Sequence, residues 1–449
     1  MFLLMKSLRL PFLLIAVLFA GFAQAQDFTI IALPDTQNEA EFNSNVLNSQ
    51  TQWIVANRAA LNIGAVLGEG DIVNDGSTTA QMQNADAAYR LLDQAGIPYF
   101  AAIGNHDYDN ADPKAARSVS GFNQWFGPAR YAGNSWYKGN LNGSNENFYG
   151  IVTMGGKQYL ILVLEYMPRP AALAWGESIL AANSAMEAII VTHSYMFVDN
   201  TRVDRCDTKD MPPGNANGDD MWAVFRKHAN VIMVVSGHLT NGQVSRRSDV
   251  GDNGNLVHQI FTNYQTFPNG GDGWLRIITF HPSSNTISLE TYSPFLNQFK
   301  TDSANQITIP YHNPNPGGQG TLSGKVRSTG CASLGGITVT AGGISTTTFS
   351  DGSYTMQINP GSYSVTASGP GWQTATLSES VAGGFDTDLD FYLTSGSSAF
   401  PTPTPSTSPT PTAPPRELHT ESGLALGHDL HASERRDRGF AGASERRHH

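Results

Sequence analysis

Five short segments of the sequence carry side chains that bind metal ions, and each follows an apolar run. The segments read LPDTQ at 33–37, GDIVN at 70–74, GNHD at 104–107, VTH at 191–193 and SGH at 236–238. Carboxylate, amide and imidazole groups coordinate divalent ions, and histidine also transfers protons near neutral pH. Each segment alone has a structural explanation, such as a helix N-cap at Asp35 or a turn at Asn105. The five together predict a metal-dependent catalytic site.

The elements that position these segments alternate between strands and helices. Apolar runs at 28–33, 65–67 and 99–103 predict buried strands. Apolar residues at helical spacing predict helices at 46–61 and 80–95 between them. Such alternation is typical of parallel strands with helical crossovers, where ligands gather at the carboxyl ends of the strands. We therefore expect the five segments to meet at one edge of a sheet.

The rest of this unit reads as hairpins and further buried strands. The sequence predicts two hairpins, 147–153 with 158–165 and 275–281 with 286–292, and two buried strands at 188–191 and 231–235. The last two runs lead directly into the histidine segments. Residues 26–300 are therefore expected to form one α/β unit with a mixed sheet.

Composition and charge exclude several classes of protein. The chain has 449 residues, of which 40% are hydrophobic and 14% charged, and a formal net charge of -11. This length predicts two to three domains at about 150 residues each, and the composition argues against wholesale disorder and against a coiled coil. The negative balance disfavours the nucleic-acid backbone as the main partner. The two cysteines cannot form a disulfide scaffold or a cysteine zinc site, and we expect two separate thiols.

The two ends of the chain read as processing and spacer segments. Residues 1–25 carry Lys6 and Arg9, then an apolar run, then Ala-Gln-Ala, which predicts a signal peptide cleaved after Ala25. The protein is therefore expected to be secreted, extracellular or periplasmic, and no later segment is apolar enough to span a membrane. Residues 395–449 are predicted to be a Pro/Thr-rich spacer followed by a disordered tail.

A second folded unit is predicted near the C-terminus. Residues 301–322 are polar and read as a linker, and 323–394 lose helical periodicity. The predicted strands are 336–341, 345–349, 353–358, 362–367 and 388–393, with Asp-Gly and Pro-Gly turns. This pattern predicts a small all-β sandwich. Its Asp-Gly-x-Tyr and Pro-Gly-x-Tyr-x-Val sequences resemble the carboxypeptidase regulatory-like domain, which implies a role in spacing, stability, or contact with a cell surface or polysaccharide.

The ordered series of metal-binding segments resembles the calcineurin-like metallophosphoesterase superfamily. Gly-Asn-His-Asp following Gly-Asp is its most specific part, and the likeness covers residues 28–293. Pro-Asp-Thr-Gln at the first segment and Leu-Glu-Tyr at 164–166 are similar to a secreted bacterial branch. The resemblance implies an α/β fold, a double β-sheet sandwich flanked by helices, with two divalent metal ions in a crevice. It also implies a small-molecule phosphate ester as substrate.

The resemblance assigns a role to each matching residue. Asp71 would bridge both ions and Asp35 would bind the first ion. The second ion would be bound by a further set, namely Asn105, His193 and His238. His106 would be the general acid that protonates the leaving oxygen. Two ions, of Mn, Fe, Mg or Zn, would polarise the ester and supply a metal-activated hydroxide.

Three positions depart from the family pattern. Gln37 and Thr240 stand where the family has histidines, and both missing imidazoles belong to the first ion. That ion would rest on Asp35, Asp71, the Gln37 amide oxygen and water, a set that favours Mn, Mg or Ca and predicts a weaker first site. Asn74 replaces an aspartate that orients the catalytic histidine, so its amide is expected to orient His106 without charge. Asp75 and Asp107 are the alternative partners.

Other side chains have two readings that the sequence leaves open. Glu165 is either a partner of a metal-binding histidine or a buried, hydrogen-bonded carboxylate. The arginines at 169, 246 and 247 either grip phosphate or lie on the surface. His258 is expected to be structural, and Asn263 and Gln265 are expected near the crevice. The loops 108–145 and 199–220 are candidate specificity elements.

Two alternative functions remain at this point. The same centre could serve a phosphodiesterase that acts on nucleotides or lipid head groups. A non-catalytic binding or adhesion protein could also keep this fold. The presence of His106 argues against the latter, because metal binding alone does not require that residue.

Overall fold

The computed structural model describes residues 26–109, 117–206, 212–240, 243–313 and 318–396. The predicted signal peptide and nearly all of the predicted spacer and tail lie outside these ranges. None of the described helices combines the length and apolar character needed to cross a bilayer.

The first sheet carries three of the five metal-binding segments. Its strand order is β13-β12-β11-β1-β2-β3, with β14 paired to β12. The strands are β1 (Phe28–Leu33), β2 (Ile63–Gly68), β3 (Tyr99–Ala101), β11 (Leu275–His281), β12 (Thr286–Ser293), β13 (Gln298–Lys300) and β14 (Ile307–Pro310). β1, β2 and β3 run parallel, so their carboxyl ends lie at one edge as predicted.

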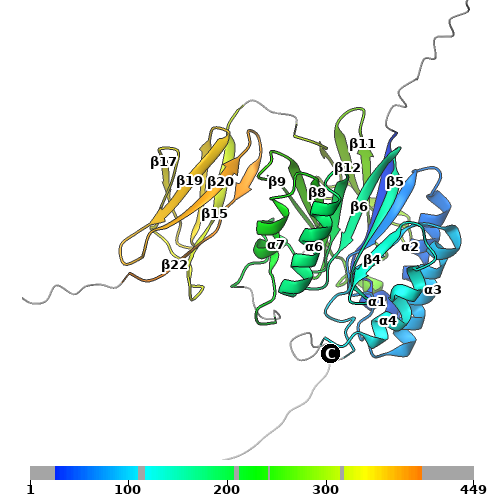
Figure 1. The fold of residues 1–449 in the computed structure, drawn as a ribbon. Helices are drawn as coiled ribbons and strands as arrows, with labels where there is room; N and C mark the ends of the chain where they lie inside the picture. The colour runs from blue at the N-terminus through cyan, green and yellow to red at the C-terminus, as the bar shows by residue number, and fades with distance from the viewer. Residues whose placement is uncertain (1–25, 110–116, 207–211, 241–242, 314–317, 397–449) are drawn as a thin grey trace, which may run out of the picture. The chain divides into compact units, whose positions relative to one another are not determined.

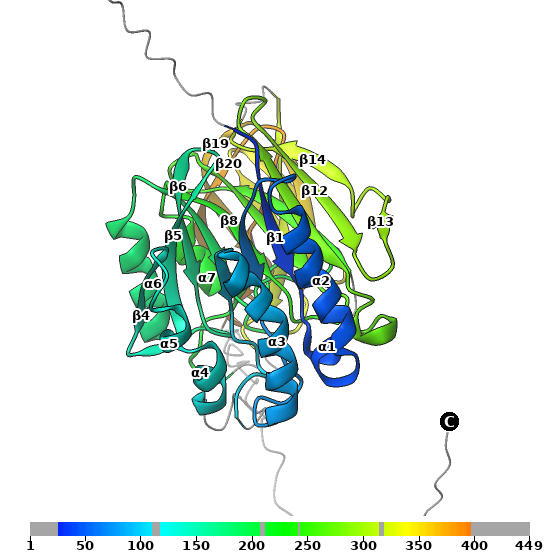
Figure 2. The same cartoon turned by 90° about the vertical axis from the view of Figure 1, so that its right-hand side faces the viewer.

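Helices cover the outer face of this sheet (Figure 2). They are α1 (Gln37–Phe42), α2 (Ser44–Asn57), α3 (Thr79–Ala95), α4 (Ser120–Phe126) and α5 (Pro128–Tyr131). Leu47 and Ile54 of α2, and Met82 and Leu92 of α3, point into the core against β1 and β2. The first pair is about two helical turns apart and the second about three, so each pair lies on one helix face, which explains why the sequence predicted both helices.

The second sheet carries the two histidine segments. Its order is β4-β5-β6-β7-β8-β10-β9. The strands are β4 (Tyr137–Leu141), β5 (Ser144–Met154), β6 (Lys157–Val163), β7 (Glu187–Val191), β8 (Val231–Ser236), β9 (Val244–Val250) and β10 (Leu256–Thr262). Helices α6 (Pro170–Ala182) and α7 (Gly218–Phe225) pack on its outer face (Figure 1).

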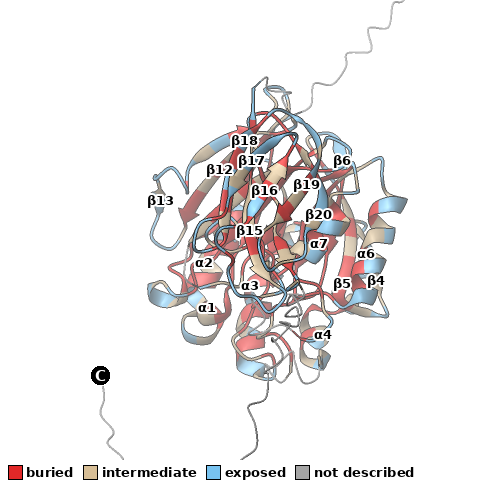
Figure 3. Cartoon of the chain, turned by 90° about the vertical axis from the view of Figure 1, so that its left-hand side faces the viewer, coloured by how far each residue is buried: buried red, intermediate tan, exposed pale blue. Residues whose placement is uncertain are grey.

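The two sheets pack against each other through a shared core. Ile30, Ala65 and Phe100 of the first sheet meet Ile161 and Met233 of the second. Strands buried on both faces read as continuous apolar runs, and β1 and β8 are buried along their whole length. The edge strand β13 is, by contrast, largely exposed (Figure 3). The predicted double-sheet α/β architecture flanked by helices is confirmed.

The C-terminal unit is all-β, also as predicted. It has the two sheets β18-β15-β21, with β22 on β15, and β17-β16-β19-β20. The strands are β15 (Gly320–Ser328), β16 (Thr338–Ala341), β17 (Ile344–Thr347), β18 (Ser353–Ile358), β19 (Gly361–Ser368), β20 (Ala375–Val381), β21 (Asp386–Asp388) and β22 (Phe391–Leu393). Leu322, Val339 and Val365 are among the buried residues of its core.

Two sequence predictions are corrected by the fold. The segment read as a linker from 301 contains β14, and Ile309 and Tyr311 are buried in the core between the two large sheets. The first unit therefore extends past residue 300. The two cysteines are not separate thiols, because Cys206 and Cys331 form a disulfide. Nothing in the local sequence indicates how far apart the two cysteines lie, and the fold brings their Cα atoms to 5.4 Å.

Candidate metal centre

The five metal-binding segments follow five parallel strands in the two sheets. Asp35, Asp71 and the Asn105-His106 pair follow β1, β2 and β3, while His193 and His238 follow β7 and β8. The strand ends of both sheets converge, so residues more than 200 positions apart in sequence come into hydrogen-bond contact. His238 N donates to Asp35 Oδ2 across 3.1 Å, for example.

One half of the centre is rich in imidazole. His193 Nε2 lies 3.1 Å from Asp71 Oδ2, 3.1 Å from His238 Nδ1 and 3.2 Å from Asn105 Oδ1. Ligand atoms of Asp71, His193 and His238 all lie within 4.8 Å of one another. We call Asp71, Asn105, His193 and His238 the imidazole half.

The imidazole half is held from behind by backbone and by a tyrosine ring. His193 Nδ1 donates to the Glu69 backbone oxygen across 2.8 Å, which leaves Nε2 free to face the centre. The Tyr166 ring lies 5.7 Å from the His193 ring and 5.2 Å from the His238 ring. Because backbone contacts orient His193, its geometry depends on the fold more than on any one side chain.

The glycines of the segments are required by close packing. A Cβ atom at Gly104 would collide with Asp71 Oδ1, and one at Gly237 would collide with Asp35 Oδ1. The Gly-Asn-His and Gly-His sequences therefore contain glycine because a carboxylate lies directly over each of these positions.

Two of the candidate ligands also have unusual backbone. Asp71 has φ 45° and His238 has φ 81°, in the left-handed region that costs residues with a Cβ atom free energy. Such conformations persist where surrounding contacts fix them, and Asp71 Oδ1 does accept a 2.9 Å hydrogen bond from His106 N.

The other half of the centre is rich in oxygen. Asp35 Oδ2 accepts a 2.8 Å hydrogen bond from Asn263 Nδ2, and Asn263 Oδ1 accepts one of 2.9 Å from Gln265 N. Gln37 Nε2 donates to Gln265 Oε1. We call Asp35, Gln37, Asn263 and Gln265 the oxygen half. Asn263 and Gln265 thus lie at the crevice, as the sequence suggested without a motif to support it.

Burial and neighbouring charges shift the pKa values of the two histidines and of Asp35 in opposite directions. Burial lowers the pKa of His193, but the carboxylates of Asp71 and Asp35 outweigh it and raise the value to about 9. Burial, with repulsion from His193, lowers the pKa of His238 to about 3. Burial raises the pKa of Asp35 well above its usual range, with His193 opposing. A divalent ion bound at this half would therefore compete with a proton for His193.

The donor atoms fit two divalent ions of different preference. The imidazole half offers two ring nitrogens, a carboxylate and an amide oxygen, a set suited to Zn, Fe or Mn. In the oxygen half, the buried Gln37 Oε1 has no hydrogen-bond partner among the described residues, which fits an oxygen that can bind a cation. Asp71 turns one oxygen toward His193, and its charge helps to raise the pKa of Asp35 in the other set.

Comparison with protein families matches residues 28–241 to the calcineurin-like phosphoesterase family. This part of the chain is a calcineurin-like phosphoesterase domain. Residues 321–394 match the carboxypeptidase regulatory-like domain. We refer to the two units as the phosphoesterase domain and the regulatory-like domain.

Individual relatives are more distant. The uncharacterized protein YvnB of Bacillus subtilis (strain 168) is 31% identical over 284 residues, which cover 61% of this chain and 21% of that protein. A purple acid phosphatase, PPD1 from yellow lupin, has 14% identity, a TM-score of 0.42, and coverage of 64% and 54% of the two chains. GAP50, the anchor in the inner membrane complex of Plasmodium, has 11% identity, a TM-score of 0.38, and coverage of 64% and 89%. Neither structural likeness is close enough to carry a functional argument.

The expected environment of His106 in the phosphoesterase domain is corrected by the structure. His106 Nδ1 lies 2.9 Å from the backbone oxygen of Asn74, whereas the Asn74 amide donates to Glu41. The two alternative partners have other contacts: Asp107 accepts from Val73 N and Gly104 N, and Asp75 accepts from Ser77 and Thr78. The sequence could not distinguish a side-chain partner from a backbone one at the same residue.

Most of the secondary candidates of the phosphoesterase domain have structural partners. Glu165 is buried and accepts from Arg169 and Asn147, so it is the hydrogen-bonded carboxylate of the two readings. Arg247 pairs with Asp249. His258 lies between Ser248 and the Tyr311 backbone oxygen, as expected of a structural histidine. The sequence did not mark Tyr166 as the ring beside both histidines, although this residue lies shortly after the end of the apolar strand β6.

Proposed function

We propose that this protein is a secreted, metal-dependent phosphoesterase that hydrolyses small-molecule phosphate esters with His106 as general acid. The observation that carries the proposal is the convergence of Asp71, His193, His238 and Asn105 beside a partly exposed His106. The match of residues 28–241 to the calcineurin-like phosphoesterase family supports the same reaction class.

The proposed ligands form two sets, one for each of two metal ions. His193, His238, Asn105 and Asp71 would hold one ion, and Asp35, Gln37 and Asp71 the other. When bound, two ions neutralise charge on the phosphoryl oxygens and lower the pKa of a water for attack. The chain's own part is to hold these donors rigidly, through the glycine contacts and the backbone bond to His193.

His106 has the geometry of a proton donor at the edge of this centre. Its Nδ1 donates to the Asn74 backbone oxygen, so Nε2 is the atom that can give a proton to the leaving oxygen. Its backbone N–H bonds Asp71, which fixes the ring's position relative to the proposed bridging carboxylate.

Two features of the chain support the proposed secretion. Residues 1–25 have the pattern of a cleaved signal peptide. The Cys206–Cys331 disulfide is of the kind that persists in oxidising compartments.

The test is hydrolysis by the purified full chain of nitrophenyl phosphate and bis-nitrophenyl phosphate. We expect a chelator to abolish hydrolysis, added Mn to restore it, and His106→Ala to lower kcat by about 10²- to 10⁴-fold. Preference for the diester would identify a phosphodiesterase. Hydrolysis that survives both the chelator and the substitution would refute the site, and metal binding without any hydrolysis would favour a binding protein.

A further inference from the structure

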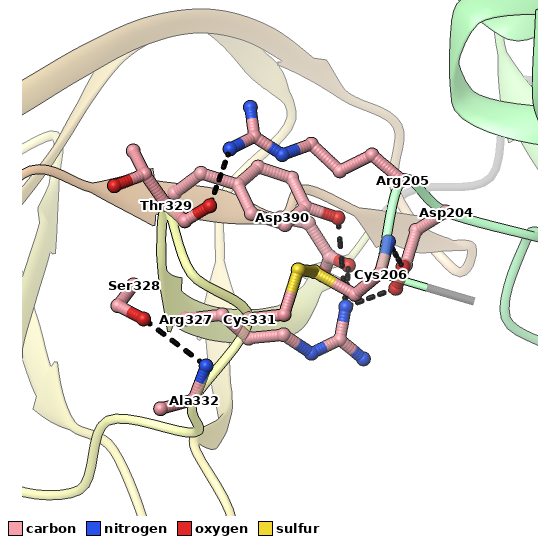
Figure 4. The surroundings of a disulfide bond; sticks show 10 residues. Asp204, Arg205, Cys206, Arg327, Ser328, Thr329, Cys331, Ala332 and Asp390 are labelled. Carbon is pink, nitrogen blue, oxygen red and sulfur yellow. Dashed lines mark hydrogen bonds and ion pairs between the residues drawn. A yellow bond between two sulfur atoms is a disulfide. The ribbon is translucent and has the colours of Figure 1, made fainter. Parts of the chain in front are cut away.

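The regulatory-like domain is covalently joined to the segment that follows a proposed metal ligand. Cys206 belongs to the loop after β7, and Cys331 lies in the regulatory-like domain after β15 (Figure 4). Beside the disulfide, Arg327 forms an ion pair with Asp204. Arg205 donates to the Thr329 backbone oxygen across 3.2 Å. Three consecutive residues of this loop are thus bound to the other domain.

The same loop segment is firmly attached to His193. Tyr195, two residues after that ligand, accepts a 2.9 Å backbone hydrogen bond from Val203 N. Met196 and Arg202 form a β-bridge. The Tyr195 hydroxyl and Arg202 Nε both donate to Gln259 Oε1, across 3.0 and 2.8 Å. Segment 194–206 therefore runs as a short, braced turn from His193 to the disulfide.

A buried charge cluster makes a second connection between the domains. Arg202 and Arg247 both pair with Asp249, and both also lie near Asp388 of the regulatory-like domain, at 3.7 and 3.2 Å. The side chains of Arg202 and Asp249 are each only 2% exposed. Without Asp388, two buried guanidinium groups would share fewer carboxylates, which is costly in a low-dielectric interior.

The C-terminal part of the loop, at residues 215–216, also contacts a segment beside the metal centre. Ala216 N donates to the Pro168 backbone oxygen and Asn215 Nδ2 to that of Met167, both across 2.8 Å. These acceptors directly follow Tyr166, whose ring lies beside His193 and His238. The described parts of the loop thus begin at one ligand and end beside the ring that packs on both histidines.

We propose that the regulatory-like domain positions the rim of the metal centre through the Cys206–Cys331 disulfide and the Asp388 carboxylate, so that reduction of the disulfide loosens segment 194–206 and slows turnover. The turnover part rests on the proposed function. Reduction by a dithiol transfers two electrons and two protons to the disulfide, which becomes two thiols, while the dithiol becomes a cyclic disulfide. The redox state of the surroundings then sets the activity.

The first experiment is hydrogen exchange on the full chain, which does not depend on catalysis. We expect residues 195–206 to exchange faster after dithiothreitol treatment and in the C206S/C331S double variant, while the strands of both domains keep their protection. Dithiothreitol should not change the double variant further. Unchanged exchange at 195–206 would overturn the proposal, and so would loss of protection throughout, since the disulfide would then serve global stability.

The second experiment compares variants that keep the disulfide. Asp388→Asn is expected to raise exchange at 195–206 and lower kcat/KM for bis-nitrophenyl phosphate by roughly three- to thirtyfold. Asp351→Asn, an exposed carboxylate of the same domain, is the matched control and should change neither. If hydrogen exchange at 195–206 in the wild type responds to reduction as expected but the protein hydrolyses no ester, the proposed function fails. The inference that the regulatory-like domain holds segment 194–206 in place is then still supported. If the oxidised protein, the reduced protein and D388N all hydrolyse esters with the same kcat/KM, the inference that the disulfide and Asp388 affect turnover is refuted.

Discussion

The two halves of the metal centre use different means to hold a cation. The imidazole half has His193 and His238, with ring nitrogens 3.1 Å apart, and orients His193 through a backbone oxygen. The oxygen half has one carboxylate, Asp35, and is built up by the amides of Asn263 and Gln265. Hydrogen-bonded amides thus organise a carboxylate in the oxygen half, whereas ring nitrogens and a backbone oxygen organise the imidazole half.

The two halves also differ in the charge that they hold without metal. His193 has a pKa of about 9 and carries a proton at neutral pH, whereas His238 has one of about 3 and is neutral. The oxygen half has Asp35, whose pKa burial raises well above its usual range. Metal binding must therefore displace a proton from the imidazole half, and this gives the two halves different pH dependence.

The largest expected effect is loss of the imidazole half itself. His193→Ala removes the donor that faces Asp71, His238 and Asn105, so the metal-ion affinity of this half should fall by at least about a hundredfold, beyond the loss caused by removing an outer partner. Elemental analysis at low free metal should then find one fewer tightly held ion. His258→Ala, at a buried structural histidine, is the control; equal metal loss in both variants would contradict the assignment.

The next effect tests the glycine contacts. Gly104→Ala would drive a methyl group into Asp71, so we expect metal affinity in both halves to fall by more than about tenfold with secondary structure retained. Gly133→Ala is the matched control, because its Cβ would meet nothing within 4 Å. Calorimetric Mn titration and circular dichroism measure the two quantities. An unaffected Gly104→Ala variant would show that Asp71 does not bridge the halves.

The pH dependence of metal binding separates the halves further. The imidazole half needs neutral His193, so its Mn affinity should rise by up to about tenfold per pH unit below pH 9 and level off above it. Without metal, the same proton stabilises the fold: this contribution is complete below the ordinary histidine pKa of 6.5 and is lost as the pH rises through about 9. Titrations from about pH 6 to about pH 8.5 test the slope. A flat profile would mean that His193 is already neutral.

The smallest effect concerns the oxygen half alone. Asn263→Ala removes a 2.8 Å hydrogen bond to Asp35, so the affinity of the first ion should fall by about tenfold and that of the second should be unchanged. Asn253→Ala, an exposed amide on the backbone of Lys227, is the control. A stoichiometric titration with Mn resolves the two ions. An equal fall in the affinity for both ions would show that the two halves do not bind metal independently.

The sequence predicted the fold and the members of the centre to different depths. Buried strands such as 28–33 and amphipathic helices such as 80–95 were recognisable because burial on one or both faces dictates apolar periodicity. Asp71 and His193 were recognisable because each follows such a strand, and parallel strands end at one edge. The strand β14 was missed since Ile307–Pro310 is short and lies among polar residues typical of a linker.

Contacts between distant segments were harder to predict. Asn263 and Gln265 lie more than 220 residues from Asp35 and Gln37, and nothing in their local sequence marks them as partners. The Asn74 backbone oxygen replaced the expected amide at His106, because a turn's carbonyl direction is not encoded by residue type. The cysteines, 125 residues apart, gave no sign of pairing until the fold brought them together.

By itself, the sequence determined the strand-and-helix order, the all-β second unit and the set of donors at the strand ends. These follow from periodicity and from residue chemistry, which are local properties. The tertiary structure decided how the donors divide into two halves, which atoms orient His106 and His193, and that the two domains are joined through Cys206 and Cys331. Those outcomes depend on how the two sheets and the second domain pack, and packing is fixed only by contacts between residues far apart in the chain.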